Sequence, residues 1–252
     1  MELKLAAQLY TLRDFLKTED DVEITLKKVK DMGYDYVQLS GLAPIDATVL
    51  RNILDDTQLK PIITHIPFER LENEYDTVVK DHHILGCKNV AIGVAPEKYR
   101  NKQGYYDFAQ IASEVAEKLK KDGLTFSYHN HAFEFKKYDS KTGFEILFEN
   151  SSDDLLAEID TFWITYGGAS PAYWIEKLAN RIVVLHYKDL VISETDEQLM
   201  AEVGEGNLDW EGIIKATKKA NIEYAAVEQD DCYGKDPFEC LKISLNNLNK
   251  MI

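Results

Sequence analysis

The sequence predicts one α/β domain over residues 1–252, a closed (β/α)₈ TIM barrel. Short apolar, β-rich runs alternate along the chain with longer segments of helical period, which is the pattern of repeated βα units. The length of 252 residues matches one closed barrel. No Gly-rich phosphate fingerprint follows the first strand, so closure is favoured over an open, doubly wound sheet. The open sheet remains the structural alternative.

Eight apolar runs are expected to form the barrel strands. Each run is short and is followed by a polar segment, as strands of a βα unit are. In chain order they are Leu3–Tyr10, Tyr36–Ser40, Pro61–Ile66, Asn89–Val94, Leu124–His129, Leu155–Asp160, Ile182–Tyr187 and Tyr224–Glu228.

Four other segments show a single apolar face at helical spacing. The first has Val22, Leu26 and Val29 on one side and stops at Gly33, a residue suited to the end of a helix. The other three faces are formed by Phe108, Ile111, Ala112, Val115, Ala116 and Leu119; by Trp210, Ile213, Ile214 and Thr217; and by Phe238, Leu241, Leu245 and Leu248. We expect all four faces to pack against the outside of the sheet.

Charge and composition disfavour several classes of partner. The formal net charge of −15 would repel nucleic acids and anionic membranes, and no Lys/Arg cluster opposes it. The first residues lack a signal-peptide layout and no apolar run is long enough to span a bilayer, so the cytoplasm is the expected location. The three cysteines show no metal-ligand spacing and receive no role. Whether the protein forms a homo-oligomer stays open.

Titratable residues collect after the strands of the second half of the predicted barrel. Active sites of such barrels lie at the C-terminal ends of the strands. The polar ends read Thr64-His65, His129-Asn130-His131-Ala132-Phe133-Glu134, Glu158-Ile159-Asp160-Thr161, His186-Tyr187-Lys188-Asp189 and Glu228-Gln229-Asp230-Asp231. A carboxylate buried there without a partner would be costly. A divalent cation such as Mn²⁺, Mg²⁺, Co²⁺ or Zn²⁺ would supply that partner.

Five segments resemble the sugar phosphate isomerase/epimerase family of xylose isomerase-like TIM barrels. They are TFSYHNHAFEF, LAEIDTFWITYGGA, RIVVLHYKDL, AEVGEGNLDW and YAAVEQD, and the resemblance is densest from Leu124 to Asp231. It implies one divalent metal ion held by Glu134, Asp160, His186 and Glu228. Relatives differ in whether the first Glu lies in the fifth strand or in the loop after it, so His129 or His131 is an alternative to Glu134.

The resemblance also implies a reaction. A metal that holds two neighbouring substrate oxygens polarises a carbonyl and stabilises the enediolate formed when an α-proton leaves. Glu134 and Glu228 would act from opposite sides of the reacting carbon as base and acid. Candidates to bind substrate are His65, His129, His131 and Lys188 through hydroxyls or a phosphate, Trp163 by stacking on a sugar ring, and Glu205 by closing over or shaping the site. The expected function is isomerisation or epimerisation of a small ketose, keto-sugar or sugar phosphate.

Three other functions stay open. The same metal and the same proton abstraction would serve a lyase or dehydratase of a keto-sugar or keto-glycoside. An endonuclease IV-like phosphodiesterase shares the barrel, but it needs a trinuclear zinc site and a basic DNA-binding face. The small number of histidines, six, disfavours the zinc site, and the net charge of −15 disfavours the DNA-binding face. A barrel that binds a sugar without turning it over is the third.

The second strand departs from the family pattern. Many relatives end this strand in Glu, whereas here it reads Tyr36-Val37-Gln38-Leu39-Ser40. This chain therefore has no acid at that position, and the hydrogen bonding there must differ from that of relatives with Glu.

Overall fold

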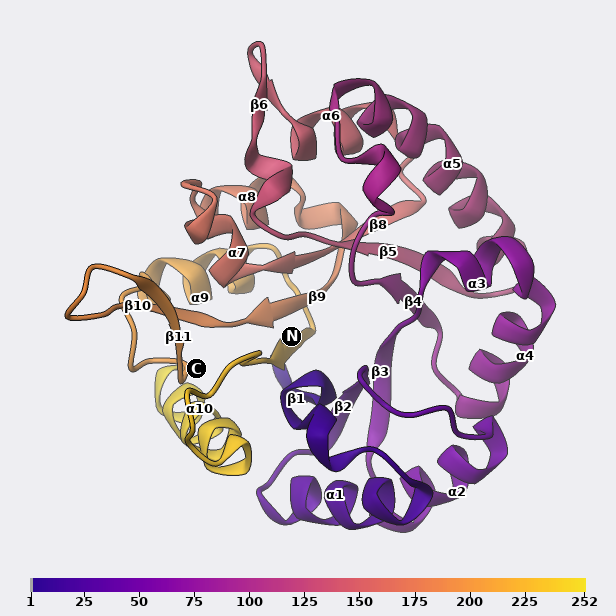
Figure 1. The fold of residues 1–252 in the computed structure, drawn as a ribbon, viewed down its shortest axis with the longest axis vertical. Helices are drawn as coiled ribbons and strands as arrows, with labels where there is room; N and C mark the ends of the chain where they lie inside the picture. Colours follow the sequence, from indigo (N-terminus) through magenta and orange to yellow (C-terminus); the bar gives the residue numbers. More distant parts are fainter. Residues whose placement is uncertain (1) are drawn as a thin grey trace.

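The computed structural model describes residues 2–252 and shows a closed barrel of eight parallel strands (Figure 1). Each strand pairs with the next around the barrel, and β1 pairs with both β2 and β12, which closes the sheet. The closed barrel is confirmed and the open sheet is excluded. In order around the barrel the strands are β1 (Lys4–Gln8), β12 (Tyr224–Val227), β9 (Ile182–Tyr187), β8 (Leu155–Asp160), β5 (Thr125–His129), β4 (Asn89–Ile92), β3 (Lys60–His65) and β2 (Tyr36–Leu39).

The strands begin and end within two residues of their predicted bounds. One of the largest differences is in the first strand, which was expected to run to Tyr10 but ends at Gln8 and continues as the 3₁₀ helix η1 (Leu9–Phe15). The Gln8 side chain accepts a hydrogen bond of 2.6 Å from the Tyr10 amide and so caps η1. This local capping bond competes with the strand ladder and ends the strand early.

Helices form a ring around the outside of the barrel (Figure 1). They are α1 (Glu19–Asp31), α2 (Ala47–Thr57), α3 (Phe68–Asn73), α4 (Tyr75–Leu85), α5 (Lys102–Lys121), α6 (Gly143–Asn150), α7 (Thr161–Tyr166), α8 (Pro171–Lys177), α9 (Trp210–Lys219) and α10 (Pro237–Met251). The four predicted apolar faces lie on α1, α5, α9 and α10 and pack inward, with Ile111, Val115 and Phe238 only partly buried at their edges.

Capping residues set the ends of the helices that flank β1. The Thr18 side chain accepts a hydrogen bond from the Asp21 amide and begins α1, and Gly33, with φ of +109°, follows its end. Asp236 caps α10 in the same way, with Pro237 in the first turn. The Tyr34 hydroxyl donates to the Leu241 carbonyl at 2.9 Å and ties the segment after α1 to α10. This contact joins the two ends of the helical ring.

A small apolar cluster lies inside the barrel, on the N-terminal side of the polar strand ends, and we call it the floor. It consists of Ala6, Ile62, Ile63, Ala91, Val184 and Ala226. On β9, the floor residue Val184 is followed two positions later by His186, and on β12 Ala226 is followed by Glu228. Because alternate residues of a strand point to the same side, these polar residues lie above the floor.

Two antiparallel hairpins extend from the barrel (Figure 1): β6 (Lys137–Tyr138) with β7 (Lys141–Thr142), and β10 (Asp189–Ile192) with β11 (Gln198–Ala201). Between residues 2 and 252, no helix has the length and apolar character needed to cross a membrane.

Candidate metal centre

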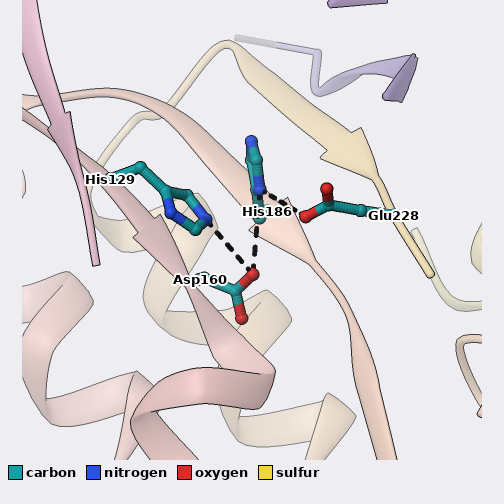
Figure 2. Close-up of side chains that lie close together, drawn as sticks. All are labelled: His129, Asp160, His186 and Glu228. Atoms are coloured by element: carbon teal, nitrogen blue, oxygen red, sulfur yellow. Dashed lines mark hydrogen bonds and ion pairs between the residues drawn. The ribbon is translucent and has the colours of Figure 1, made fainter. Parts of the chain in front are cut away.

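Four side chains from four adjacent strands meet at the C-terminal end of the barrel (Figure 2). His129 and Asp160 end β5 and β8, His186 lies on β9, and Glu228 directly follows β12. Each offers one ligand atom, and these atoms lie within 4.8 Å of one another. All four side chains are buried. We call these four residues the ligand group.

Hydrogen bonds orient the ligand group. His186 Nδ1 lies 2.9 Å from Glu228 Oε2 and 3.7 Å from Asp160 Oδ2. His129 Nδ1 donates to the Gly93 carbonyl at 3.1 Å, and its Nε2 lies 3.4 Å from Asp160 Oδ2. Nδ1 is therefore occupied by the carbonyl, and Nε2 is the nitrogen left to face an ion. The other Asp160 oxygen, Oδ1, accepts from the Trp163 amide at 2.8 Å and caps α7. Asp160 Oδ2 is therefore the oxygen left to face an ion.

The buried ammonium of Lys188 lies beside the ligand group. Its Nζ is 2.6 Å from Asp230 Oδ2, 3.2 Å from Glu228 Oε2 and 3.6 Å from Asp160 Oδ2. Burial opposes the positive charge, but these carboxylates outweigh it and hold the pKa of Lys188 above its usual value. Lys188 therefore stays charged and offsets part of the negative charge at this end of the barrel.

The same interactions shift the pKa values of the ligand group. Burial would raise the pKa of Asp160 and of Glu228, but the charge of Lys188 and hydrogen bonds from the neighbouring histidines hold both well below their usual range. Burial would lower the pKa of His186, but the charges of Glu158 and Glu228 hold it well above its usual value. In the absence of an ion His186 is therefore protonated, and an ion bound at Nδ1 would displace that proton.

The donor set suits a divalent cation. Glu158, Asp160 and Glu228 place three buried carboxylates at this end of the barrel, and Lys188 and His186 supply two positive charges. An ion at His186 Nδ1 would displace that ring's proton, so the three carboxylates and Lys188 would leave two negative charges, which a divalent cation would balance. Two imidazoles and two carboxylates are a ligand set that Zn²⁺, Mn²⁺ or Co²⁺ accepts, with positions left for substrate oxygens.

Glu134 lies apart from the ligand group. Its buried carboxylate accepts hydrogen bonds from the Tyr128 hydroxyl at 2.6 Å and from the His131 amide at 2.9 Å. Tyr128 neighbours His129 on β5 and points to the opposite face, where its ring packs against Phe108 of α5. The structure therefore places Glu134 outside the ligand group, which includes His129, one of the two alternatives to Glu134 named from the sequence. Burial raises the pKa of Glu134 to about 7.

A cavity of about 780 Å³ opens above the ligand group. The predicted substrate-binding residues His65, His129, His131, Trp163 and Lys188 all line it, as does Glu228. The His131 ring packs 5.2 Å from the Trp163 ring, and burial lowers the pKa of His131 to about 3, so this side chain is neutral. The cavity therefore combines hydrogen-bonding groups with an aromatic wall, as small-molecule sites commonly do.

Glu205 does not line the cavity. Its carboxylate accepts a hydrogen bond of 2.8 Å from Asn247 on α10. The buried carboxylate of Asp189 holds the surrounding loop by accepting from the amides of Gly204 and Gly206, and a Cβ at Gly206 would collide with it. Glu205 therefore does not lie over the cavity in this structure, and its other expected role, shaping the site, stays a prediction.

Three residues without an assigned role in the sequence contact the ligand group. Gln8 Nε2 donates to Glu228 Oε1 at 2.8 Å, and Gln38 Oε1 and Glu158 Oε1 lie 2.8 and 2.9 Å from His186 Nε2. Gln38 thus gives the second strand, which has no acid at its end, an acceptor for His186. Strand alternation carried a signal for Glu158, because it lies two residues before Asp160 on β8.

Comparison with known proteins agrees with this architecture. The family described as "Xylose isomerase-like TIM barrel" matches residues 26–236. An inosose dehydratase from Clostridium beijerinckii is 23% identical over 269 residues, which cover 89% of this chain and 87% of that protein. Two structures from Parabacteroides distasonis, each described as a sugar phosphate isomerase/epimerase, have TM-scores of 0.80 and 0.82 at 24% and 23% identity; they cover 98% and 99% of this chain and 94% and 98% of their own.

The IOLI protein, whose structure is described as binding a zinc atom, shares the fold with a TM-score of 0.70 at 15% identity, over 99% of this chain and 98% of its own. The family match covers most of the chain, and the barrel carries the buried His/Asp/Glu group at its C-terminal end. The chain therefore belongs to the xylose isomerase-like TIM barrel family.

Proposed function

We propose that this protein is a divalent-metal-dependent enzyme that isomerises or epimerises a small ketose, keto-sugar or sugar phosphate by removing a proton next to a carbonyl. One observation carries the proposal: Glu228 belongs to the ligand group and also lines the cavity. A carboxylate in that position is within reach of both an ion and a substrate carbon.

The proposed ligands are His129, Asp160, His186 and Glu228, so that His129 replaces the Glu134 of the sequence-based expectation. A divalent ion bound by these residues would polarise a substrate carbonyl and make the neighbouring C–H bond more acidic.

Glu228 is the proposed base. Gln8 anchors its Oε1 at 2.8 Å, while His186 and Lys188 contact its Oε2, so the carboxylate is held in one orientation. Its lowered pKa keeps it ionised at neutral pH, which a proton acceptor requires. Lys188, with its Nζ 3.2 Å from Glu228 Oε2, is placed to donate a hydrogen bond to the substrate oxygen as negative charge develops on it.

The remaining cavity residues would bind the rest of the substrate. His65 and His131 present ring nitrogens for hydroxyl groups, and Trp163 forms an aromatic wall beside His131. In this arrangement Glu134 acts through the His131 amide that it holds.

A lyase or dehydratase acting on a keto-sugar or keto-glycoside is the second candidate, because the chain is 23% identical to an inosose dehydratase over 89% of its length. Both candidates share the proton abstraction by Glu228. They differ in where a proton goes next. An isomerase would return the proton on Glu228 to the neighbouring carbon, an epimerase would add a proton from solvent to the opposite face of the same carbon, and a lyase would give the proton to a leaving group that departs as water or an alcohol.

An assay of the Mn²⁺-loaded protein with a panel of ketoses, sugar phosphates and keto-glycosides would test both candidates. Interconversion of sugars supports the isomerase, and release of water or an alcohol supports the lyase. The Glu228→Gln variant is the control for each activity. Absence of turnover across the panel by a fully loaded wild-type protein would contradict the proposal.

A further inference from the structure

We propose that Glu158 is a positioning residue that fixes the tautomers of two histidines at once. It holds His186 with Nδ1 toward the ion and His65 with Nδ1 toward the substrate. This inference rests on the proposed function and adds to it how one carboxylate organises the ion site and a hydroxyl-binding site together.

Glu158 is fully buried on β8 and divides its two oxygens between two rings. Oε1 lies 2.9 Å from His186 Nε2, and Oε2 lies 2.5 Å from His65 Nε2. An ionised carboxylate can only accept hydrogen bonds, so both Nε2 atoms must carry a hydrogen. A neutral imidazole with its hydrogen on Nε2 has its lone pair on Nδ1. Glu158 therefore selects the same tautomer in both rings.

For His186, this tautomer directs the lone pair at the ligand group. Nδ1 faces Glu228 Oε2 and Asp160 Oδ2, at 2.9 and 3.7 Å. Gln38 Oε1 is a second acceptor for the hydrogen on Nε2, at 2.8 Å. Because an amide could face the ring with either its oxygen or its nitrogen, the carboxylate of Glu158 decides the orientation of Gln38 as well.

For His65, the same tautomer leaves an acceptor at the cavity wall. The side chain is 12% exposed and lines the cavity, and within residues 2–252 its Nδ1 receives no hydrogen bond. Gly93 lies beside it, and a Cβ at that position would come within 3.2 Å of His65 Nδ1. The glycine therefore leaves room in which a substrate hydroxyl can donate to Nδ1.

Direct observation of the two tautomers tests this assignment. Protein carrying ¹⁵N-labelled histidine is loaded with ¹¹³Cd²⁺ and studied by NMR. We expect cadmium coupling at Nδ1 of His186, with a retained hydrogen on Nε2 of both His186 and His65. Coupling at Nε2 of His186 would overturn the inference and leave the proposed function intact, whereas absence of bound cadmium at the ligand group would contradict the proposed function itself.

Variants of Glu158 measure the effect on the ion. Loss of a partner that orients a metal-ligating histidine typically weakens metal binding about 10- to 100-fold. We expect that loss of cadmium affinity in Glu158→Ala. The matched control is Glu202→Ala, because Glu202 is also buried but pairs with Lys235 and Cys240 away from the ligand group. Equal affinities in the two variants would overturn the inference.

Glu158→Gln keeps the shape of the side chain and covers the case in which Glu158→Ala fails to fold. A glutamine has one acceptor oxygen, so it satisfies only one of the two Nε2–H groups. Because Gln38 still accepts from His186, we expect His65 to change tautomer while His186 keeps its own. An unchanged His65 spectrum would contradict the role of Glu158.

Gly93→Ala separates the effect on substrate binding at His65 from the effect on ion binding at His186. The added methyl group would crowd His65 Nδ1, while the Gly93 carbonyl that accepts from His129 is retained. We expect KM for a turned-over substrate to rise about 3- to 10-fold, the value of one lost hydrogen bond, with cadmium coupling unchanged. An unchanged KM would show that His65 Nδ1 does not contact the substrate.

Discussion

The floor and the ligand group occupy two levels of the same barrel interior, and they differ in every chemical respect. The floor consists of alanine, valine and isoleucine side chains in contact with one another. Two residues after Val184 the chain has His186, and two residues after Ala226 it has Glu228. A single step of strand alternation thus separates apolar packing from a cluster of buried charges.

This difference shows that the floor contributes stability to the barrel, whereas the ligand group contributes its proposed function. Burying apolar side chains favours folding, whereas burying carboxylates and an ammonium costs free energy that their mutual attraction only partly returns. The floor therefore supplies rigid strands, and the ligand group uses that rigidity to hold charges close together. Substitutions in the ligand group should change ion binding and turnover, and substitutions in the floor should change stability alone.

Glu228→Gln should have the largest effect. The amide keeps the size of the side chain but neither removes a proton nor offers a charged ligand, so turnover should fall at least about 1,000-fold, or about 4 kcal/mol of transition-state stabilisation. Steady-state rates of the Mn²⁺-loaded variant, with circular dichroism as a check of folding, measure this. Turnover within tenfold of the wild-type rate would remove Glu228 from the mechanism.

Lys188→Met should destabilise the protein in an ion-dependent way. Removing the ammonium leaves Asp160, Glu228 and Asp230 without their shared cation, which should lower the free energy of unfolding of the ion-free protein by about 3–5 kcal/mol. Saturating Zn²⁺ should reduce this deficit, because the ion neutralises two of the same carboxylates. Denaturant unfolding with and without Zn²⁺ measures both values, and an identical deficit in the two conditions would contradict the shared-charge account.

Ile63→Ala tests the floor. Truncating this fully buried side chain should lower the free energy of unfolding by about 2–5 kcal/mol through lost burial and a new cavity. The variant should bind Zn²⁺ with wild-type affinity, because Ile63 belongs to the floor and offers no hydrogen bond to the ligand group. A large loss of affinity by calorimetry would show that the two levels are not separable.

Glu134→Gln should give a smaller effect that depends on pH. The folded pKa of Glu134 is raised from its ordinary value of 4.5 to about 7, so between these values the folded chain retains a proton that the unfolded chain has lost. Wild-type stability should therefore fall relative to the variant as pH rises from about 4.5 to about 7, by roughly 2–3 kcal/mol. Unfolding curves of both proteins at pH 4.5, 6 and 7.5 measure the difference, and a constant difference across that range would refute it.

The periodicity of the sequence was enough to predict the barrel and part of the site. Asp160, His186 and Glu228 each stand at the end of an apolar strand, and strand ends meet at one edge of a parallel barrel. The choice between His129 and Glu134 could not be made in that way. Glu134 lies in the short 3₁₀ helix η3 (Phe133–Phe135) after β5, where strand alternation no longer applies, and its position depends on the long-range packing of Tyr128 against α5.

The hydrogen-bond partners of His186 could not be predicted from the sequence either. Gln38, Glu158 and His186 come from β2, β8 and β9, and the distances between them depend on barrel closure. The register of β8 against β9 also shifts between Ala157 and Glu158, so the distance between Glu158 and His186 does not follow from alternation along either strand alone. Contacts of this kind follow from the closed sheet and not from any local segment.

Anomalous diffraction from crystals soaked with Zn²⁺ tests the central claim most directly. The account predicts one ion at the C-terminal end of the barrel, about 2.0–2.2 Å from His129 Nε2, Asp160 Oδ2, His186 Nδ1 and Glu228 Oε2. A fully loaded crystal with no peak among these atoms, or with an ion bound by Glu134 and not by His129, would contradict it.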